Sequence, residues 1–273
     1  MKLVWDDFIR GGFFTAISAS ALILSIAKIL GWMIEWHFLL LVLLISIIIY
    51  FSNFIGELKE DFLDATDEYR VMRKRKPVLL IFVVLLTTTC LVLSMIWANY
   101  LSTIFIVCFL ALGILYTLGI KKLTKRVIGF KDFYVTICWN LIILFYLLFY
   151  QYSLTTSVII IIFLVLTRDF INVCFCDIKD IVTDRKNGLL TLANILGKKK
   201  LLLYLQLLNV ISILIVFFGV YANYLPNTTL ILIIAFVLTA IFIKIADLRK
   251  NFSTATVDAE YTIWIILMLV VSK

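Results

Sequence analysis

The sequence predicts an all-α membrane protein that crosses the bilayer several times. Of its 273 residues, 64% are hydrophobic and only 15% are charged, whereas soluble domains are usually about 25% charged. A soluble core cannot bury so much apolar side chain, so part of it must face lipid. Long apolar runs such as residues 159–163 do not alternate with polar residues, which favours helices over the strands of a membrane barrel.

Nine apolar runs have the length of a membrane-spanning helix, because about 20 residues at 1.5 Å each cross the hydrocarbon. The predicted spans are residues 13–32, 34–56, 78–98, 100–119, 133–152, 155–176, 200–222, 228–246 and 256–272. The only two prolines, Pro77 and Pro226, fall in the predicted loops.

The basic residues predict the orientation of these spans. With nine spans, nearly every Lys and Arg falls on one side, in the segments 2–10, 59–76, 121–131, 179–200 and 249–250. The loops of the opposite side have none, and only Lys273 follows the last span. The positive-inside rule therefore places the N-terminus and the basic loops in the cytoplasm. The net charge of +8 is then a topological signal, and we expect no nucleic-acid partner.

Acidic residues gather where two spans emerge on the basic side. Six of the 17 carboxylates lie within 57–68 and three within 177–184. On helices they form two one-faced stripes, namely Asn53, Glu57 and Asp61 in the first cluster, and Asp177, Asp180 and Asp184 in the second.

Like charges at these spacings repel each other, so we expect a bound cation to offset the repulsion within the two stripes. Mg²⁺ prefers carboxylate oxygens together with the oxygens of a substrate phosphate. The pattern predicts a magnesium site for a phosphorylated ligand. The alternative is that the acids are solvated loop ends balanced by nearby Lys and Arg.

The segment 177–197 resembles the second aspartate-rich motif of the UbiA superfamily of membrane prenyltransferases. The positions that match are Asp177, Asp180, Asp184, Gly188, Thr191, Leu192 and Gly197. Thr183 stands where that motif usually has glycine. Residues 53–61 are similar to the first motif, N-D-x-x-D-x-x-x-D, with Phe54 in place of one acid and Glu57 in place of another. The basic stretch 73–77 and the segment 116–126 also resemble the family.

This resemblance implies a single UbiA-like prenyltransferase domain over residues 1–273, with nine transmembrane helices around a central cavity. It implies a Mg²⁺-dependent enzyme in the membrane that ionises an isoprenyl diphosphate. The prenyl group would pass to a lipophilic acceptor, most readily an aromatic quinone precursor. The active site would face the cytoplasm.

The resemblance also implies roles for individual residues. The metal ligands would be Asn53, Glu57, Asp61, Asp177, Asp180 and Asp184. The catalytic residues would be Asp61, Asp180, Asp184, Lys122 and Arg126. The substrate would contact Asn53, Arg75, Tyr116, Lys122, Lys125 and Arg126. The alternative for the basic residues is that they only fix the topology.

Some polar residues lie inside predicted spans, where such groups are candidates for function. Asp169 either extends the second acidic stripe or is neutralised locally, and we favour a structural role for it and for Arg168. For Asn140 we expect a hydrogen bond between helices.

Other functions remain open. A terpene cyclase of the same superfamily ionises the same diphosphate without an acceptor, and the altered first motif favours it. A CDP-alcohol phosphotransferase would need a D-G-x-x-A-R opening that is absent before Asp177. A secondary transporter would place its charges near mid-membrane between broken helices.

Overall fold

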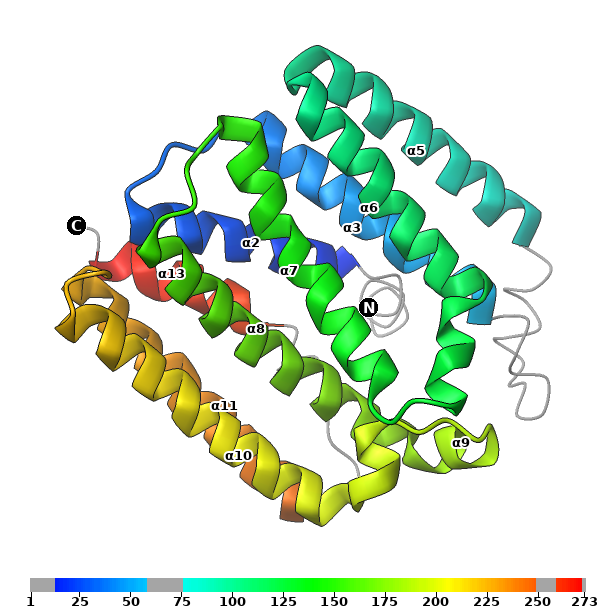
Figure 1. Ribbon diagram of the computed structural model, residues 1–273, viewed down its shortest axis with the longest axis vertical. Coiled ribbons are helices and arrows are strands. Elements are labelled where there is room, and N and C mark those ends of the chain that lie inside the picture. The colour runs from blue at the N-terminus through cyan, green and yellow to red at the C-terminus, as the bar shows by residue number, and fades with distance from the viewer. Residues whose placement is uncertain (1–12, 58–75, 249–258, 272–273) are drawn as a thin grey trace, which may run out of the picture.

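The computed structural model describes residues 13–57, 76–248 and 259–271, and in these ranges all regular secondary structure is helical (Figure 1). The prediction of an all-α fold is therefore confirmed. The elements are α2 (Phe13–Leu30), α3 (Trp36–Glu57), α5 (Lys76–Trp97), α6 (Tyr100–Leu118), η1 (Ile120–Lys125), α7 (Phe130–Tyr150), α8 (Thr156–Asp177), η2 (Ile178–Asp180), α9 (Ile181–Lys186), α10 (Leu192–Tyr221), η3 (Asn227–Ile231), α11 (Leu232–Leu248) and α13 (Glu260–Val271).

The number of spans agrees closely with the prediction. Eight helical segments in the described ranges are long and apolar enough to cross a membrane. The last helix, α13, is apolar but has 12 residues, so the predicted count of nine is approximate. Most ends fall within a few residues of the predicted ones. One difference bears on the site: α7 begins at Phe130 and not at 133, because Gly129, with φ of +68°, ends the preceding turn.

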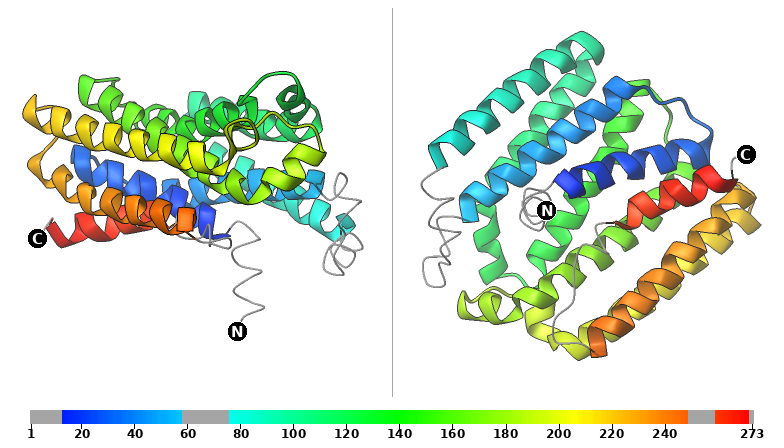
Figure 2. Two further views of the ribbon diagram at one scale, coloured as in Figure 1. Left: turned by 90° about the horizontal axis from the view of Figure 1, so that it is seen from below. Right: turned by 180° about the vertical axis from the view of Figure 1, so that it is seen from behind.

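The helices pack side by side into a closed ring. In order of contact the ring runs α2, α3, α6, α7, α8, α10, α11 and α13, and α13 returns to α2. Helix α5 lies outside the ring against α3 and α6, as Figure 2 shows from two further sides. Three side chains of α5, Val78, Ile81 and Val84, are 66, 61 and 63% exposed. Because they are apolar, this outer face of α5 is the kind of surface that lipid covers.

Local sequence explains where several helices begin. The side chain of Asn99 accepts a hydrogen bond from the backbone N–H of Ser102 at the start of α6. Thr155 caps α8 and Thr191 caps α10 in the same way. Such caps satisfy backbone donors that have no partner inside the helix. Gly197 interrupts α10 with a φ of +72°, so the long run that crosses the membrane begins just after this kink.

Candidate active site

A cavity of about 410 Å³ lies between the helices of the ring. Its lining comes from α2, α3, α6, α7, α8 and α13, together with η2. One end of the cavity, called its mouth below, lies where α3 and α8 end and α7 begins. The polar residues on this side are Asn53, Lys131, Asn172 and Asp177. Apolar and aromatic side chains form most of the remaining wall. The cavity thus joins a charged mouth to a largely hydrophobic interior.

Asp177 is the residue of the second motif that enters the cavity. It is the last residue of α8, it is buried, and it lines the cavity. The Nζ of Lys131, on the first turn of α7, donates a hydrogen bond of 2.7 Å to its Oδ1. Its other oxygen, Oδ2, is buried and accepts no hydrogen bond from the described part of the chain. One oxygen of Asp177 is therefore held by a cation while the other is available to a ligand.

Asp184 is buried on α9 and organises the turn that leads to α10. The hydroxyl of Thr191 donates to its Oδ2 at 3.2 Å, and the backbone N–H of Leu189 donates to its carbonyl oxygen at 2.9 Å. Lys131 interacts electrostatically with both Asp177 and Asp184. The two outer aspartates of the motif therefore both lie close enough to this ammonium group to interact with its charge.

Asp132 fixes the start of α7 relative to the start of α10. Its side chain is fully buried, and its Oδ2 accepts a 3.0 Å hydrogen bond from the backbone N–H of Leu192. The Sγ of Cys174 on α8 donates to its Oδ1 at 3.7 Å. This anchoring explains why a residue just before it in sequence, Lys131, is held so closely against α8.

The second motif is not a single straight helix. Helix α8 ends at Asp177, η2 spans Ile178–Asp180, and α9 begins at Ile181. The three aspartates therefore do not follow one continuous helical face, contrary to the predicted stripe. Asp180 is half-buried on η2. Within the described residues no three His, Cys, Asp or Glu side chains come together as a metal site, so the predicted metal ligation stays a prediction.

The first motif is described only in part. Asn53 on α3 lines the cavity, as does Tyr116 on α6. The ring of Tyr116 stacks on that of Tyr134 with centroids 4.8 Å apart. Glu57 is the last residue of α3, but its side chain, like Asp61 and Arg75, lies outside the described part of the structure. The roles predicted for these three residues stay predictions.

Three of the basic residues predicted to bind substrate lie away from the cavity. Lys122 and Lys125 are exposed on η1, and Arg126 is exposed just after it. None of the three lines the cavity in the described structure. Lys131 does line it, although nothing in the sequence separates this residue from the lysines that only fix the topology. Asn172 is a second residue that the prediction missed, five positions before Asp177 on α8.

At the inner end of the cavity, α7, α8 and α13 meet around Asp169. Eight residues separate Asp169 from Asp177, about 12 Å along a helix. The Nδ2 of Asn140 donates a 2.9 Å hydrogen bond to Oδ2 of Asp169, which confirms the expected bond between helices. The hydroxyl of Tyr261 donates to Oδ1. Asp169 and Tyr261 both line the cavity.

Arg168, next to Asp169 in sequence, is turned away from the cavity into the contact of α8 with α10, α11 and α13. Its Nε and Nη2 donate to the two oxygens of Glu260 at 2.6 and 2.8 Å. Its remaining donors bind Asn209 and Thr239. The guanidinium is fully buried, and its donors are engaged by these partners. This geometry agrees with the structural role expected for Arg168.

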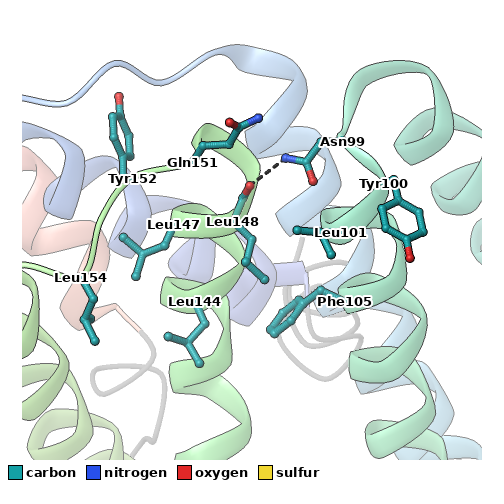
Figure 3. A pocket seen from close by; sticks show the side chains of 10 residues that line it. All are labelled: Asn99, Tyr100, Leu101, Phe105, Leu144, Leu147, Leu148, Gln151, Tyr152 and Leu154. Atoms are coloured by element: carbon teal, nitrogen blue, oxygen red, sulfur yellow. Dashed lines mark hydrogen bonds between the residues drawn. The ribbon is translucent and has the colours of Figure 1, made fainter.

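A larger hollow, of about 690 Å³, lies between α6 and α7 at the opposite end of the helices (Figure 3). Its lining residues, from Asn99 to Leu154, include no charged side chain. The Nδ2 of Asn99 is already bound to the carbonyl oxygen of Leu148 at 2.7 Å (Figure 3). Because this hollow has no charged side chain to hold a cation or a phosphate, the cavity with Asp177 is the candidate active site.

Comparisons with known proteins identify the family and the fold. The model of the UbiA prenyltransferase family matches residues 12–266. Among solved structures, a UbiA homologue from Aeropyrum pernix K1 superposes with a TM-score of 0.68 at 16% identity, covering 97% of this chain and 98% of that one. A UbiA homologue from Archaeoglobus fulgidus bound to DMAPP and Mg²⁺ gives a TM-score of 0.65 at 12% identity, covering 94% of each chain.

A digeranylgeranylglyceryl phosphate synthase gives a TM-score of 0.58 at 18% identity, covering 99% of this chain and 97% of that one. No curated protein sequence matches the chain. The structural similarities establish the fold, and the family model covers nearly the whole sequence. The chain is a multi-pass membrane protein that belongs to the UbiA prenyltransferase family.

Proposed function

We propose that this protein is a Mg²⁺-dependent membrane prenyltransferase. It ionises an isoprenyl diphosphate and transfers the prenyl group to a lipophilic acceptor, with an aromatic quinone precursor as the expected class. The observation that carries this proposal is a single cavity with a charged mouth at Asp177 and Lys131 and an aromatic interior. Two structures of relatives, bound to DMAPP or GPP with Mg²⁺, support it.

Oxygen atoms at the mouth of the cavity fit a magnesium ion. Both Oδ2 of Asp177 and Oδ1 of Asn172 are buried, and neither has a hydrogen-bond partner in the described structure. Carboxylate and amide oxygens are ligands that a hard cation accepts, and buried oxygens without partners are otherwise unfavourable. Together with Asn53 and the acids of both motifs, these residues would hold the ion. When bound, Mg²⁺ would neutralise charge on the diphosphate.

Lys131 is positioned to bind the diphosphate directly. Asp177 engages its ammonium group, which fixes the group in place and leaves its other N–H donors for phosphate oxygens. A fixed cation at this point stabilises the negative charge that develops on the leaving diphosphate as the C–O bond breaks. We propose that Lys131 adds to the cations Lys122, Lys125, Arg126 and Arg75 predicted from the sequence.

The aromatic wall suits the prenyl cation that ionisation produces. Tyr50, Phe109, Tyr134 and Trp139 all line the cavity. The faces of such rings attract positive charge, with an energy of about 0.5–2 kcal/mol for each contact. Apolar walls also exclude water, which would otherwise capture the cation.

The site is proposed to open toward the cytoplasm. Helix α8 ends with Asp177 at the same end of the molecule as η1 and α9 (Figure 1). Exposed cations on these two elements include Lys122, Lys125, Arg185 and Lys186. The positive-inside rule assigns this end to the cytoplasmic side.

Turnover assays test the proposal. Purified protein in detergent is incubated with Mg²⁺ and prenyl diphosphates of several chain lengths, with and without phenolic and hydroquinone acceptors. We expect diphosphate release that requires an acceptor and stops when a chelator removes the metal. Equal release without any acceptor, with a cyclic product, would instead identify a terpene cyclase. Full activity in excess chelator would contradict the metal dependence.

A further inference from the structure

The inner end of the cavity contains a buried acidic side chain, Asp169, which a molecule bound in the cavity would contact. Asp169 is 5% exposed, and it lines the cavity about two helical turns below Asp177. Asn140 and Tyr261 both donate hydrogen bonds to its oxygens. A carboxylate accepts both bonds and keeps lone pairs for a further donor. The two hydrogen bonds therefore orient the carboxylate and leave it able to accept a hydrogen bond from a ligand.

In its carboxylate form, Asp169 has no oppositely charged side chain close to it among the described residues that line the cavity. Arg168 is bound to Glu260, Asn209 and Thr239 and does not line the cavity. The two lysines in the described lining are Lys131 and Lys179, and both lie at the mouth, beside Asp177 and on η2. A second anion placed near Asp169 would therefore be repelled in surroundings of low polarity, where charges interact strongly.

From this geometry we infer that the inner end of the cavity takes an uncharged acceptor that carries a hydroxyl group, and that Asp169 removes the hydroxyl proton during transfer. The inference rests on the proposed prenyl transfer. The C1–O bond of the prenyl diphosphate breaks, and its electron pair leaves with the diphosphate. The acceptor oxygen, or a ring carbon conjugated with it, supplies the pair for the new bond to C1. The O–H proton passes to a carboxylate oxygen of Asp169. Where a ring carbon forms the new bond, the proton on that carbon then moves to the ring oxygen, which restores the aromatic ring and the hydroxyl group.

The substitution Asp169→Asn removes the charge and the basic oxygen with little change of shape. The hydroxyl of Tyr261 still finds a carbonyl oxygen to bind. Oδ1 of Asn140 is buried without a hydrogen-bond partner in the described structure, so turning the Asn140 amide over offers an acceptor to the new NH₂ group. Asp247→Asn is the matched control, because Asp247 is exposed on α11 and makes the same chemical change outside the cavity.

The first test compares two probes that have the same pentylphenyl group and different charge, the neutral 4-pentylphenol and the anionic 4-pentylbenzoate. Their affinities are measured by calorimetry in detergent, with Mg²⁺ and the unreactive analogue geranyl thiolodiphosphate present. We expect the unmodified protein to bind the phenol at least about tenfold more tightly, as repulsion between buried like charges requires. In Asp169→Asn this ratio should fall to within about threefold, while Asp247→Asn keeps it. A benzoate preference in the unmodified protein, or an unchanged ratio in Asp169→Asn, would overturn the inference.

The second test measures transfer from geranyl diphosphate to the acceptor that the turnover assays identify. Loss of a general base typically costs about 10²–10⁴-fold, so Asp169→Asn should lower transfer at least about 100-fold. Its affinity for geranyl thiolodiphosphate should stay within about threefold of the unmodified protein, because that ligand binds at the mouth. Unchanged transfer, or an equal loss of analogue binding, would overturn the role.

These outcomes separate the inference from the proposed function. An unmodified protein that does not bind geranyl thiolodiphosphate in the presence of Mg²⁺ contradicts the prenyltransferase itself. A protein that binds the analogue but prefers the benzoate contradicts only the assignment of Asp169 and of an uncharged acceptor.

Discussion

At the scale of single residues, Lys131 determines the electrostatics of the cavity mouth. Its ammonium group lies 2.7 Å from Oδ1 of Asp177 and interacts with Asp184 as well. Without it, the buried carboxylates of Asp177 and Asp184 would interact with each other without this neighbouring cation, which is unfavourable in surroundings of low polarity. Lys131 therefore both stabilises the buried aspartates and presents donors to a diphosphate.

This role predicts the effect of Lys131→Gln. The variant should weaken binding of geranyl thiolodiphosphate by at least about tenfold, because a charge-assisted contact is worth about 1.5–3 kcal/mol. Arg126→Gln should change it less, since Arg126 is exposed and does not line the cavity. Lys244→Gln, exposed on α11, is the control for lost charge. A large loss of binding in Arg126→Gln with none in Lys131→Gln would contradict this role and would show that the basic segment after α6 binds the diphosphate.

The sequence pointed to Asp177 and Asp184, which the structure places close to Lys131, but not to Lys131 or Asn172. The acids stand out because their spacing is unusual beside a membrane. Lys131 is one of several lysines in a basic loop, and only the packing of α7 against α8 turns it inward. That packing depends on Asp132, whose partners Leu192 and Cys174 are 60 and 42 residues away. No local pattern reports contacts of this kind.

At the scale of helices, the contact between α3 and α6 depends on Gly56. A Cβ at this position would lie 1.9 Å from Cγ2 of Thr117. The Thr117 methyl cannot rotate away freely, because a β-branched side chain in a helix has few allowed rotamers. Gly56 lies one turn beyond Asn53 on α3, so the same close contact sets how the first motif meets the cavity.

Gly56→Ala should therefore destabilise the protein by about 1–3 kcal/mol, the usual cost of overpacking. Thr117→Ser removes the clashing methyl and keeps the hydroxyl, which bonds the carbonyl oxygen of Gly113. The double variant should recover most of the stability lost in Gly56→Ala. Thermal unfolding in detergent, followed by tryptophan fluorescence, measures both. The same loss in the single and the double variant would show that α3 and α6 do not approach so closely.

The turn between α9 and α10 depends on Thr191, which caps α10 and donates to Asp184. Thr191→Val keeps the shape and removes the hydroxyl. We expect a loss of stability of about 1–3 kcal/mol, because a cap is lost and a buried carboxylate loses a donor. Thr183→Val, at an exposed position on α9, is the matched control. Equal melting temperatures for the two variants would contradict this role of Thr191.

At the scale of the whole molecule, a buried ion pair helps to close the ring. Arg168 on α8 and Glu260 on α13 are joined by two hydrogen bonds, and Arg168 also binds Asn209 on α10 and Thr239 on α11. Four helices thus meet at one guanidinium. Breaking a buried pair by removing one partner leaves an uncompensated charge, which typically costs about 3–5 kcal/mol.

Arg168→Met should accordingly lower the unfolding temperature sharply, because Glu260 remains charged and buried. Adding Glu260→Gln removes that charge and should restore part of the loss. The same fluorescence assay of thermal unfolding compares the two variants. If the double variant is less stable than Arg168→Met alone, the two residues do not act as a pair.

The overall architecture was predictable because the thickness of the bilayer sets the length of each apolar run. The runs at 100–119 and 155–176 correspond closely to α6 and α8 for this reason. The closure of the ring was not predictable. Arg168 and Glu260 are 92 residues apart in sequence, and the order in which α10, α11 and α13 pack around α8 follows from side-chain fit that no periodicity reveals.

The central claim is that the cavity mouth binds a prenyl diphosphate through Asp177 and Mg²⁺. The most direct measurement is the affinity of the purified protein for geranyl thiolodiphosphate, with Mg²⁺ and with excess chelator, in the unmodified protein, in Asp177→Asn and in the control Asp247→Asn. We expect tight binding that needs Mg²⁺, is lost in Asp177→Asn and is kept in the control. Binding of equal strength in chelator, or in Asp177→Asn, would contradict it.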